Sequence, residues 1–488
     1  MTFRIAALLA CLVVGGFMNA QPPNVLILFA DDQRPDTIGA HGNPYIRTPN
    51  LDRLVADGFS FRRAYCLGSQ GGAVCVPSRA MLNTGKSFFK LSSDMRGETT
   101  LGQLLGRSGF TTFATGKWHN GESSWLKSFQ RGRNLMFGGM SSHVKVPIRD
   151  LGPDGQLTPA REGARFSSTL FADAAIDFLR NYRDPAPFFA YVAFTAPHDP
   201  RNPPPRYRRL YYRNPPPLPP NFAPQHPFNN GHMTGRDESL GPWPRTREVV
   251  QDQLSEYYGL ISHLDGQVGR ILRELRKGPH AENTIVVYTA DHGLAVGSHG
   301  LLGKQNLYEH SMGAPLVFAG PGIPKGAESN ALCYLLDVFP TLCTQVGIDL
   351  PGDVDGLDLS PIWMGEADSV RRAVFTSFRH LMKAVRDERW KLIRYPPINH
   401  LQLFDLERDP HETRNLAAES RHAERVAALT NLMREWQAHM GDDDPLSVPD
   451  PEPRGIDLSG RQRTEDRWQP DWIVEKYFRS PLGSRIAR

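Results

Sequence analysis

A cysteine and an arginine within one short stretch have the clearest potential for chemistry. The stretch reads Cys75-Val76-Pro77-Ser78-Arg79-Ala80-Met81-Leu82-Asn83-Thr84-Gly85. Proline suits the first turn of a helix and glycine often ends one, so the spacing predicts a helix with Cys75 just before its N-terminus. Helix N-termini favour anions, and Arg79 adds a permanent positive charge one turn further on. The pattern favours a reactive cysteine, although a buried cysteine beside a surface arginine would also fit it.

Pairs of possible metal ligands follow two apolar runs. The runs are residues 24–30 and 283–290, and they end in Asp31-Asp32 and in Asp291-His292. Such runs predict strands buried on both faces of a parallel sheet, and ligands bind at the carboxyl ends of these strands. Adjacent carboxylates repel each other unless a cation lies between them. The pairs therefore favour a hard cation such as calcium or magnesium, the alternative being solvated acidic turns.

Other titratable side chains stand near predicted strand ends. Lys117 and His119 follow the run 111–114, His198 follows the run 187–194, and Lys304 comes shortly after the second ligand pair. A lysine there can hold an anion, and a histidine can transfer a proton. Taken alone, each of these residues is more often a surface residue, so the hypothesis depends on the strand ends meeting in space.

The remaining pattern predicts an α/β fold with a large mixed, mostly parallel sheet flanked by helices. Helices are expected over residues 50–56, 101–107, 248–277 and 336–346, and a further strand over 315–318. From about residue 374 the pattern changes to short strands joined by polar turns, at 382–385, 390–393 and 402–404, followed by a helix at 423–439. This predicts a smaller C-terminal domain built on an antiparallel sheet. The expected domains are therefore 21–373, the catalytic part, and 374–488.

Residues 201–244 are rich in proline, arginine and aromatic side chains and are expected to form a long irregular loop directly after His198. Loops of this length are usually functional or disordered. The arginines and aromatic rings would suit an anionic sugar, and a solvated insertion is the alternative reading.

Length and composition limit the class of protein. A chain of 488 residues is long for a single compact core, so one large domain and a smaller one are expected. The net charge of +4 is too small to indicate a nucleic-acid partner. Residues 1–20 have the charged start, short apolar run and small final residue of a secretory signal, which predicts export to the periplasm or the extracellular space. Lipid attachment at Cys11 is a weaker alternative, and no later segment is long and apolar enough to span a membrane.

Four cysteines remain after the expected cleavage. They are Cys66, Cys75, Cys333 and Cys343. An exported protein can form disulfides, but we expect none between Cys333 and Cys343. We expect Cys66 to have a structural role.

Together these motifs resemble the type I sulfatases of the alkaline phosphatase superfamily, over nearly the whole mature chain. The resemblance rests on residues 24–32, 48–54, 75–85, 116–119, 196–198, 291–293, 304, 402–406 and 409–410. The cysteine signature is the specific part, because the other segments recur in related phosphatases. Asn83 stands where family members more often carry leucine or another apolar residue, at a position without chemical function.

The resemblance implies that Cys75 is oxidised to formylglycine by a formylglycine-generating enzyme. An aldehyde hydrate provides a neutral hydroxyl as nucleophile, which suits attack on a negatively charged sulfate ester, and its second hydroxyl provides a way out of the covalent intermediate. The implied activity is sulfuric ester hydrolysis. Export and the basic loop favour a sulfated carbohydrate as the substrate.

The resemblance also implies a role for each site residue. Asp31, Asp32, Asp291 and His292, with residue 75, would bind one calcium, although many relatives have asparagine at position 292 and imidazole is a softer ligand than calcium prefers. The remaining roles are orientation of the nucleophile by Arg79, sulfate binding by Lys117 and Lys304, protonation of the leaving alcohol by His198, and proton removal from the second hydroxyl by His119. Gln33, His299 and His310 could line the pocket, without an assigned role.

Two alternatives remain open from the sequence. A phosphodiester or phosphonate monoester hydrolase of the same superfamily would use a similar site. A non-catalytic, calcium-dependent glycan-binding protein would keep the fold without turnover, but it would have no use for a maturation signature around Cys75.

Overall fold

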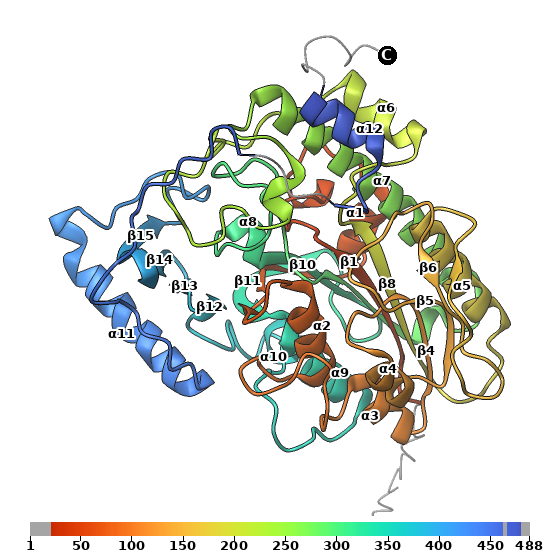
Figure 1. Cartoon of the computed structure of the whole chain (residues 1–488). Helices are drawn as coiled ribbons and strands as arrows, with labels where there is room; N and C mark the ends of the chain where they lie inside the picture. The colour runs from red at the N-terminus through yellow and green to blue at the C-terminus, as the bar shows by residue number, and fades with distance from the viewer. Residues whose placement is uncertain (1–20, 462–465, 480–488) are drawn as a thin grey trace, which may run out of the picture.

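The computed structural model describes residues 21–461 and 466–479 (Figure 1). The predicted signal segment, residues 1–20 with Cys11, lies outside the described residues. No described helix is both long enough and apolar enough to cross a membrane.

The larger sheet has eight strands in the order β11-β2-β10-β9-β1-β8-β4-β5. Its strands are β1 (Asn24–Asp31), β2 (Phe59–Tyr65), β4 (Thr111–Lys117), β5 (Arg131–Met136), β8 (Phe188–Pro197), β9 (Thr284–Ala290), β10 (Gly313–Ala319) and β11 (Ala327–Tyr334). β1 pairs in parallel with both β8 and β9, and only β10 runs antiparallel to its neighbours. Every residue of β1, β8 and β9 is buried, as their continuous apolar sequences predict.

Helices flank this sheet in two groups (Figure 1). The helices are α1 (Pro49–Ala56), α2 (Cys75–Thr84), α3 (Leu101–Arg107), α4 (Glu122–Ser128), α5 (Ser167–Asn181), α6 (Pro205–Arg213), α7 (Arg247–Lys277), α8 (Glu309–Met312), α9 (Val338–Val346), α10 (Ser360–Trp363), α11 (Ala423–Met440) and α12 (Asp471–Val474). One group contains α1, α5 and α7, in which α1 and α5 each contact α7, and the other contains α2, α3, α4 and α9. The predicted α/β class, with a mixed and mostly parallel sheet, is confirmed.

A second sheet of five strands carries the C-terminal part of the chain. Its strands are β3 (Gly68–Ser69), β12 (Val374–Phe378), β13 (Met382–Arg386), β14 (Trp390–Tyr395) and β15 (His400–Asp405), and a two-stranded ribbon elsewhere joins β6 (Pro147–Ile148) to β7 (Arg161–Glu162). β12 to β15 pair antiparallel, as predicted, and α11 packs against β13 and β14. β3 pairs in parallel with β12 and so links the catalytic half to this sheet. The boundary at residue 373 stays a prediction.

The expectation of an irregular loop over residues 201–244 was partly wrong. The segment contains α6 and a short 3-10 turn, Asp237–Leu240. Pro205 begins α6, where its missing N–H costs nothing. Tyr207 and Tyr211 are spaced by four residues and turn toward α7, where the Tyr211 hydroxyl hydrogen-bonds Ser262. Proline-rich composition hid this helical spacing.

Candidate active site

The ends of β1 and β9 bring three carboxylates together. Ala30 is in register with Ala290, so the residues that follow lie at one edge of the sheet. The Asp32 backbone N–H donates a hydrogen bond of 2.9 Å to Asp291 Oδ1. Asp31, Asp32 and Asp291 are buried, and each has an oxygen within 4.8 Å of the others.

Helix α2 places an arginine between these carboxylates. The helix begins at Cys75 itself, one residue earlier than the sequence suggests, and Gly85 ends it with φ +69°. The Ser78 hydroxyl donates to the Asp291 carbonyl oxygen at 2.6 Å and fixes the helix against β9. Arg79 is fully buried, and its Nη2 lies 3.3 Å from Asp31 Oδ1 and 3.2 Å from Asp291 Oδ2.

Two lysines complete the charge balance. Lys117 Nζ lies 2.5 Å from Asp31 Oδ2, and Lys304 Nζ lies 2.8 Å from Asp32 Oδ1. Both lysines are buried. Three carboxylates therefore face three cations, and their formal charges cancel. A divalent ion added to this centre would leave it net positive, which would attract an anionic ester.

The residues present fit a hard metal ion. His292 Nδ1 lies 2.9 Å from the Gly293 carbonyl oxygen, so Nδ1 carries a proton and Nε2 is the nitrogen that a neutral ring would offer to a metal ion. That Nε2 is buried without a hydrogen-bond partner, 3.5 Å from Asp32 Oδ1 and 3.8 Å from Asp291 Oδ1. Asp31 Oδ1 is buried without a hydrogen bond, and its partner is the charge of Arg79 at 3.3 Å. A buried imidazole nitrogen without a partner, beside clustered carboxylates, is what a bound cation would explain.

Cys75 lies next to this cluster. Its Sγ is 3.3 Å from His119 Nδ1 and 4.0 Å from Lys117 Nζ. Burial raises the pKa of the Cys75 thiol, but the charges of Lys117 and His119 outweigh burial and hold this pKa well below its usual value. The donor atoms of Cys75, Asp291 and His292 lie within 4.8 Å of one another. Residue 75 is therefore in reach of both the carboxylates and the bases.

His198 follows β8 and reaches the same edge. Its Nε2 lies 3.7 Å from Asp32 Oδ2. Burial acts to lower the pKa of His198, but the Asp32 carboxylate outweighs burial and raises it to about 9. The buried ring is therefore readily protonated, as a proton donor must be.

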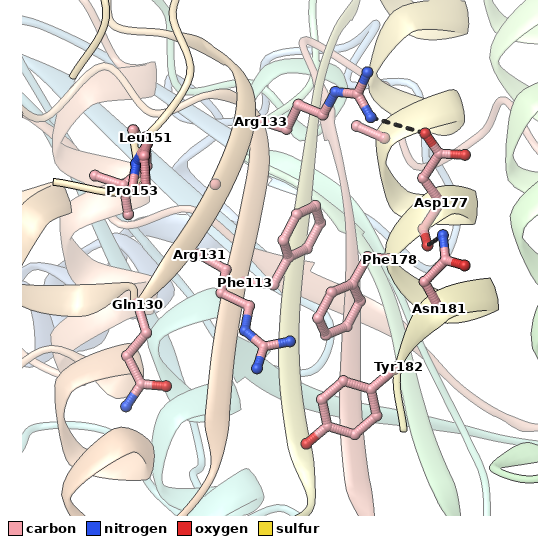
Figure 2. A pocket seen from close by; sticks show the side chains of 13 residues that line it. Phe113, Gln130, Arg131, Arg133, Leu151, Pro153, Asp177, Phe178, Asn181 and Tyr182 are labelled. Carbon is pink, nitrogen blue, oxygen red and sulfur yellow. Dashed lines mark hydrogen bonds and ion pairs between the residues drawn. The ribbon is translucent and has the colours of Figure 1, made fainter. Parts of the chain in front are cut away.

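The three residues without an assigned role make contacts with side chains outside the carboxylate cluster. Gln33 accepts a hydrogen bond from the Tyr288 hydroxyl. His299 and His310 are 3.2 Å apart and belong to a buried aromatic cluster in which Tyr308 stacks on His299 at 3.8 Å. A separate hollow between β5 and α5, about 420 Å³ in volume, is lined by none of the predicted site residues (Figure 2).

Three charged residues near His198 and Lys304 had no role in the sequence-based hypothesis. They are Asp199, Arg236 and Asp237. Asp199 could have been noticed, since it follows His198 directly. Arg236 and Asp237 come from the segment expected to be irregular, and no spacing signal connects them to the site.

Comparisons with known proteins identify the family of this chain. The sulfatase family model matches residues 23–348, and the model of the C-terminal part of N-sulphoglucosamine sulphohydrolase matches residues 297–439. The chain is 25% identical to an N-acetylglucosamine-6-O-sulfatase of Bacteroides thetaiotaomicron, over 87% of this chain and 88% of that protein. It is 30% identical to human arylsulfatase A, over 74% of this chain and 72% of the relative.

Solved structures show the same fold. A protein in complex with its substrate D-glucosamine-2-N,6-O-disulfate superposes with a TM-score of 0.74 at 23% identity, covering 88% of this chain and 99% of the other. A phosphonate monoester hydrolase of Agrobacterium radiobacter superposes with a TM-score of 0.69 at 23% identity, covering 86% and 96%. Because the sulfatase model spans well over half of the sequence, the chain belongs to the sulfatase family and is a sulfuric ester hydrolase.

Proposed function

We propose that this protein is an exported sulfatase that removes sulfate from a sulfated carbohydrate, with a nucleophile made from Cys75 and one bound calcium. The proposal rests on one observation: Cys75 lies beside a buried cluster of three carboxylates and three cationic side chains. The cluster consists of Asp31, Asp32, Asp291, Arg79, Lys117 and Lys304. The substrate class is supported by the names of two similar proteins, one an N-acetylglucosamine-6-O-sulfatase and the other bound to a disulfated glucosamine.

We propose that a formylglycine-generating enzyme converts Cys75 to formylglycine, whose hydrate supplies the hydroxyl that attacks sulfur and a second hydroxyl that allows sulfate to leave. Asp31, Asp32, Asp291 and His292 would hold the calcium. The ion would supply positive charge that makes the hydroxyl beside it more acidic.

The chain's own residues then bind and orient the sulfate ester. Arg79 faces Asp31 and Asp291 from α2 and would orient the hydrated residue 75 beside it. Lys117 contacts Asp31 and Lys304 contacts Asp32, and both lysines would hold sulfate oxygens. These buried cations would offset negative charge that grows during transfer, without needing to reorganise.

Two histidines would move the protons. His198, on the Asp32 side, would give a proton to the leaving alcohol as its bond to sulfur breaks. His119, 3.3 Å from Cys75 Sγ, would take the proton from the second hydroxyl, so that sulfate leaves and the aldehyde returns. Each histidine therefore acts on one half of the cycle.

A phosphonate monoester hydrolase is the second candidate, because a protein of that name has the same fold. The test is to produce the protein with a formylglycine-generating enzyme and to compare hydrolysis of 4-nitrophenyl sulfate, glucosamine 6-sulfate and a phenylphosphonate monoester. We expect sulfate release from the sulfated sugar and a lower kcat/KM on the phosphonate. Preference for the phosphonate, with no turnover of either sulfate, would contradict the proposal.

The location has its own test. Cleavage after Ala20 and recovery of the protein outside the cytoplasm would support export. An unprocessed N-terminus on protein that stays in the cytoplasm would contradict it.

A further inference from the structure

We propose that Asp199 and Arg236 are positioning residues for His198, and that Asp466, near the end of the chain, holds Arg236 in place. This inference rests on the proposed function, in which His198 protonates the leaving alcohol. It gives a role to the arginine-rich segment that follows β8, and to a part of the chain far from His198 in sequence.

The first contact fixes the His198 ring. His198 Nδ1 lies 2.9 Å from the Asp199 carbonyl oxygen and 3.2 Å from Asp199 Oδ1. Both partners are acceptors, so Nδ1 must carry a proton and Nε2 must face the reacting centre. When Nε2 gives its proton to the leaving oxygen, the ring becomes neutral and keeps the Nδ1 proton on Asp199. The carboxylate thus stabilises the charged ring and selects its orientation.

The second contact fixes the carboxylate. Asp199 is 5% exposed, and the Arg236 fork binds both of its oxygens, with Nη1 at 2.6 Å from Oδ1 and Nη2 at 2.5 Å from Oδ2. A planar guanidinium that binds both oxygens restricts the carboxylate to one plane. Arg236 Nη1 also lies 3.0 Å from Asp237 Oδ1, and Asp237 Oδ2 lies 3.9 Å from Lys304 Nζ. Arg236 is therefore connected to His198 through Asp199 and to Lys304 through Asp237.

The third contact comes from residues 466–479, called the C-terminal segment below. Arg236 Nε donates to Asp466 Oδ2 at 2.7 Å, and Gln469 Nε2 donates to Asp199 Oδ2 at 2.6 Å. This segment is anchored on α7, where Tyr477 packs against Val249 and its hydroxyl donates to Asp252 Oδ2 at 2.5 Å. In Figure 1, α12 lies across α6 at the top of the molecule. The segment thus contacts both Arg236 and Asp199.

The test is the dependence of kcat/KM on the leaving group, measured with aryl sulfates whose phenols differ in pKa, on the matured full chain. A good leaving group such as 4-nitrophenolate departs without a proton, whereas a poor one needs His198. We expect Asp199→Asn to lower kcat/KM about 10- to 100-fold for the poorest leaving group and less than about threefold for 4-nitrophenyl sulfate. Arg236→Gln should do the same, and Arg236→Lys should restore part of the loss.

A remote ion pair of the same type provides the control. Asp405 is also 5% exposed and binds the Arg389 fork, with contacts of 2.9 and 2.6 Å. Asp405→Asn and Arg389→Lys should leave the leaving-group dependence unchanged even if they lower the unfolding temperature. If Asp199→Asn does not fold, Asp466→Asn tests the same chain of contacts with a smaller expected loss.

Two results would overturn the inference. One is an equal loss for every leaving group in the Asp199 and Arg236 variants, which is what a general loss of structure produces. The other is a leaving-group dependence of kcat/KM that is the same in all of these variants as in the wild type. A wild-type protein that is matured at residue 75 but hydrolyses none of the sulfates would instead remove the proposed function, and this inference with it.

Discussion

The two sides of the site are built in different ways. The carboxylate centre stands on the ends of β1 and β9 and on the first turns of α2, all of them buried and hydrogen-bonded to one another. The His198 side stands on residues that follow β8, on Arg236 from a segment with little regular structure, and on Asp466 from the C-terminal segment. The first side is held by the sheet, whereas the second is held mainly by ion pairs. We therefore expect substitutions in the centre to abolish turnover and those on the His198 side to change which esters are turned over.

The largest effect should come from the nucleophile position. Cys75→Ala should lower turnover of every sulfate ester by at least about 10⁴-fold while the protein stays folded, because the covalent route is lost. An assay of sulfate release measures the loss of turnover, and thermal unfolding shows whether the variant stays folded. Cys343→Ala is the matched control, since Cys343 is also buried and unpaired, and it should cost stability but not activity. Sulfate release retained by Cys75→Ala would move the nucleophile elsewhere.

Loss of a carboxylate should come next. Asp291→Asn removes an expected calcium ligand and one partner of Arg79, and we expect activity to fall about 10²- to 10³-fold together with weaker calcium binding. Chelation of the wild type should abolish activity, and added calcium should restore it. Titration of activity against free calcium checks both expectations. A calcium requirement identical in wild type and variant would exclude Asp291 from the ligands.

The backbone that positions Lys117 gives a third, smaller effect. Gly116 has φ +94°, and a Cβ there would lie 1.8 Å from the Ala193 carbonyl oxygen on β8. Gly116→Ala should therefore destabilise the fold by about 3 kcal/mol and displace Lys117. Gly106→Ala, whose Cβ would meet nothing closer than 3.6 Å, should change stability by less than about 1 kcal/mol. Equal unfolding free energies for the two variants would show that β4 tolerates the change.

The smallest effect should come from Gln469, which contacts Asp199 from the C-terminal segment. Gln469→Ala removes one of the hydrogen bonds to Asp199 but leaves the Arg236 fork intact. We expect kcat/KM for poor leaving groups to fall about two- to threefold, which corresponds to one modest hydrogen bond. A loss as large as that of Asp199→Asn would show that the C-terminal segment, and not Arg236, does most of the positioning.

The sequence was sufficient for the first side and insufficient for the second. Asp31 and Asp291 could be placed together because buried apolar strands of a parallel sheet end at a common edge. Pro77 and Gly85 marked α2, so Arg79 could be placed as well, although Cys75 proved to be the first residue of the helix. These predictions needed only local patterns and one rule of topology.

The contacts of Arg236 could not be predicted in this way. They join a segment after β8 to residues near the end of the chain, without periodicity or a shared sheet edge. Helix α6 was not predicted either, because it is only nine residues long and lies in a proline-rich segment, where one pair of tyrosines spaced by four residues is a weak helical signal. Ion pairs between distant segments depend on the tertiary fold, and no pattern in a single sequence reports them.

We propose that residue 75, set among the carboxylates and cations of this site, becomes the formylglycine nucleophile. The mass of the peptide that carries residue 75, from protein made in a host with the maturation enzyme, tests it most directly. We predict the mass decrease of a thiol converted to an aldehyde, in active protein. An unmodified cysteine in protein that hydrolyses sulfate esters at full rate would contradict it.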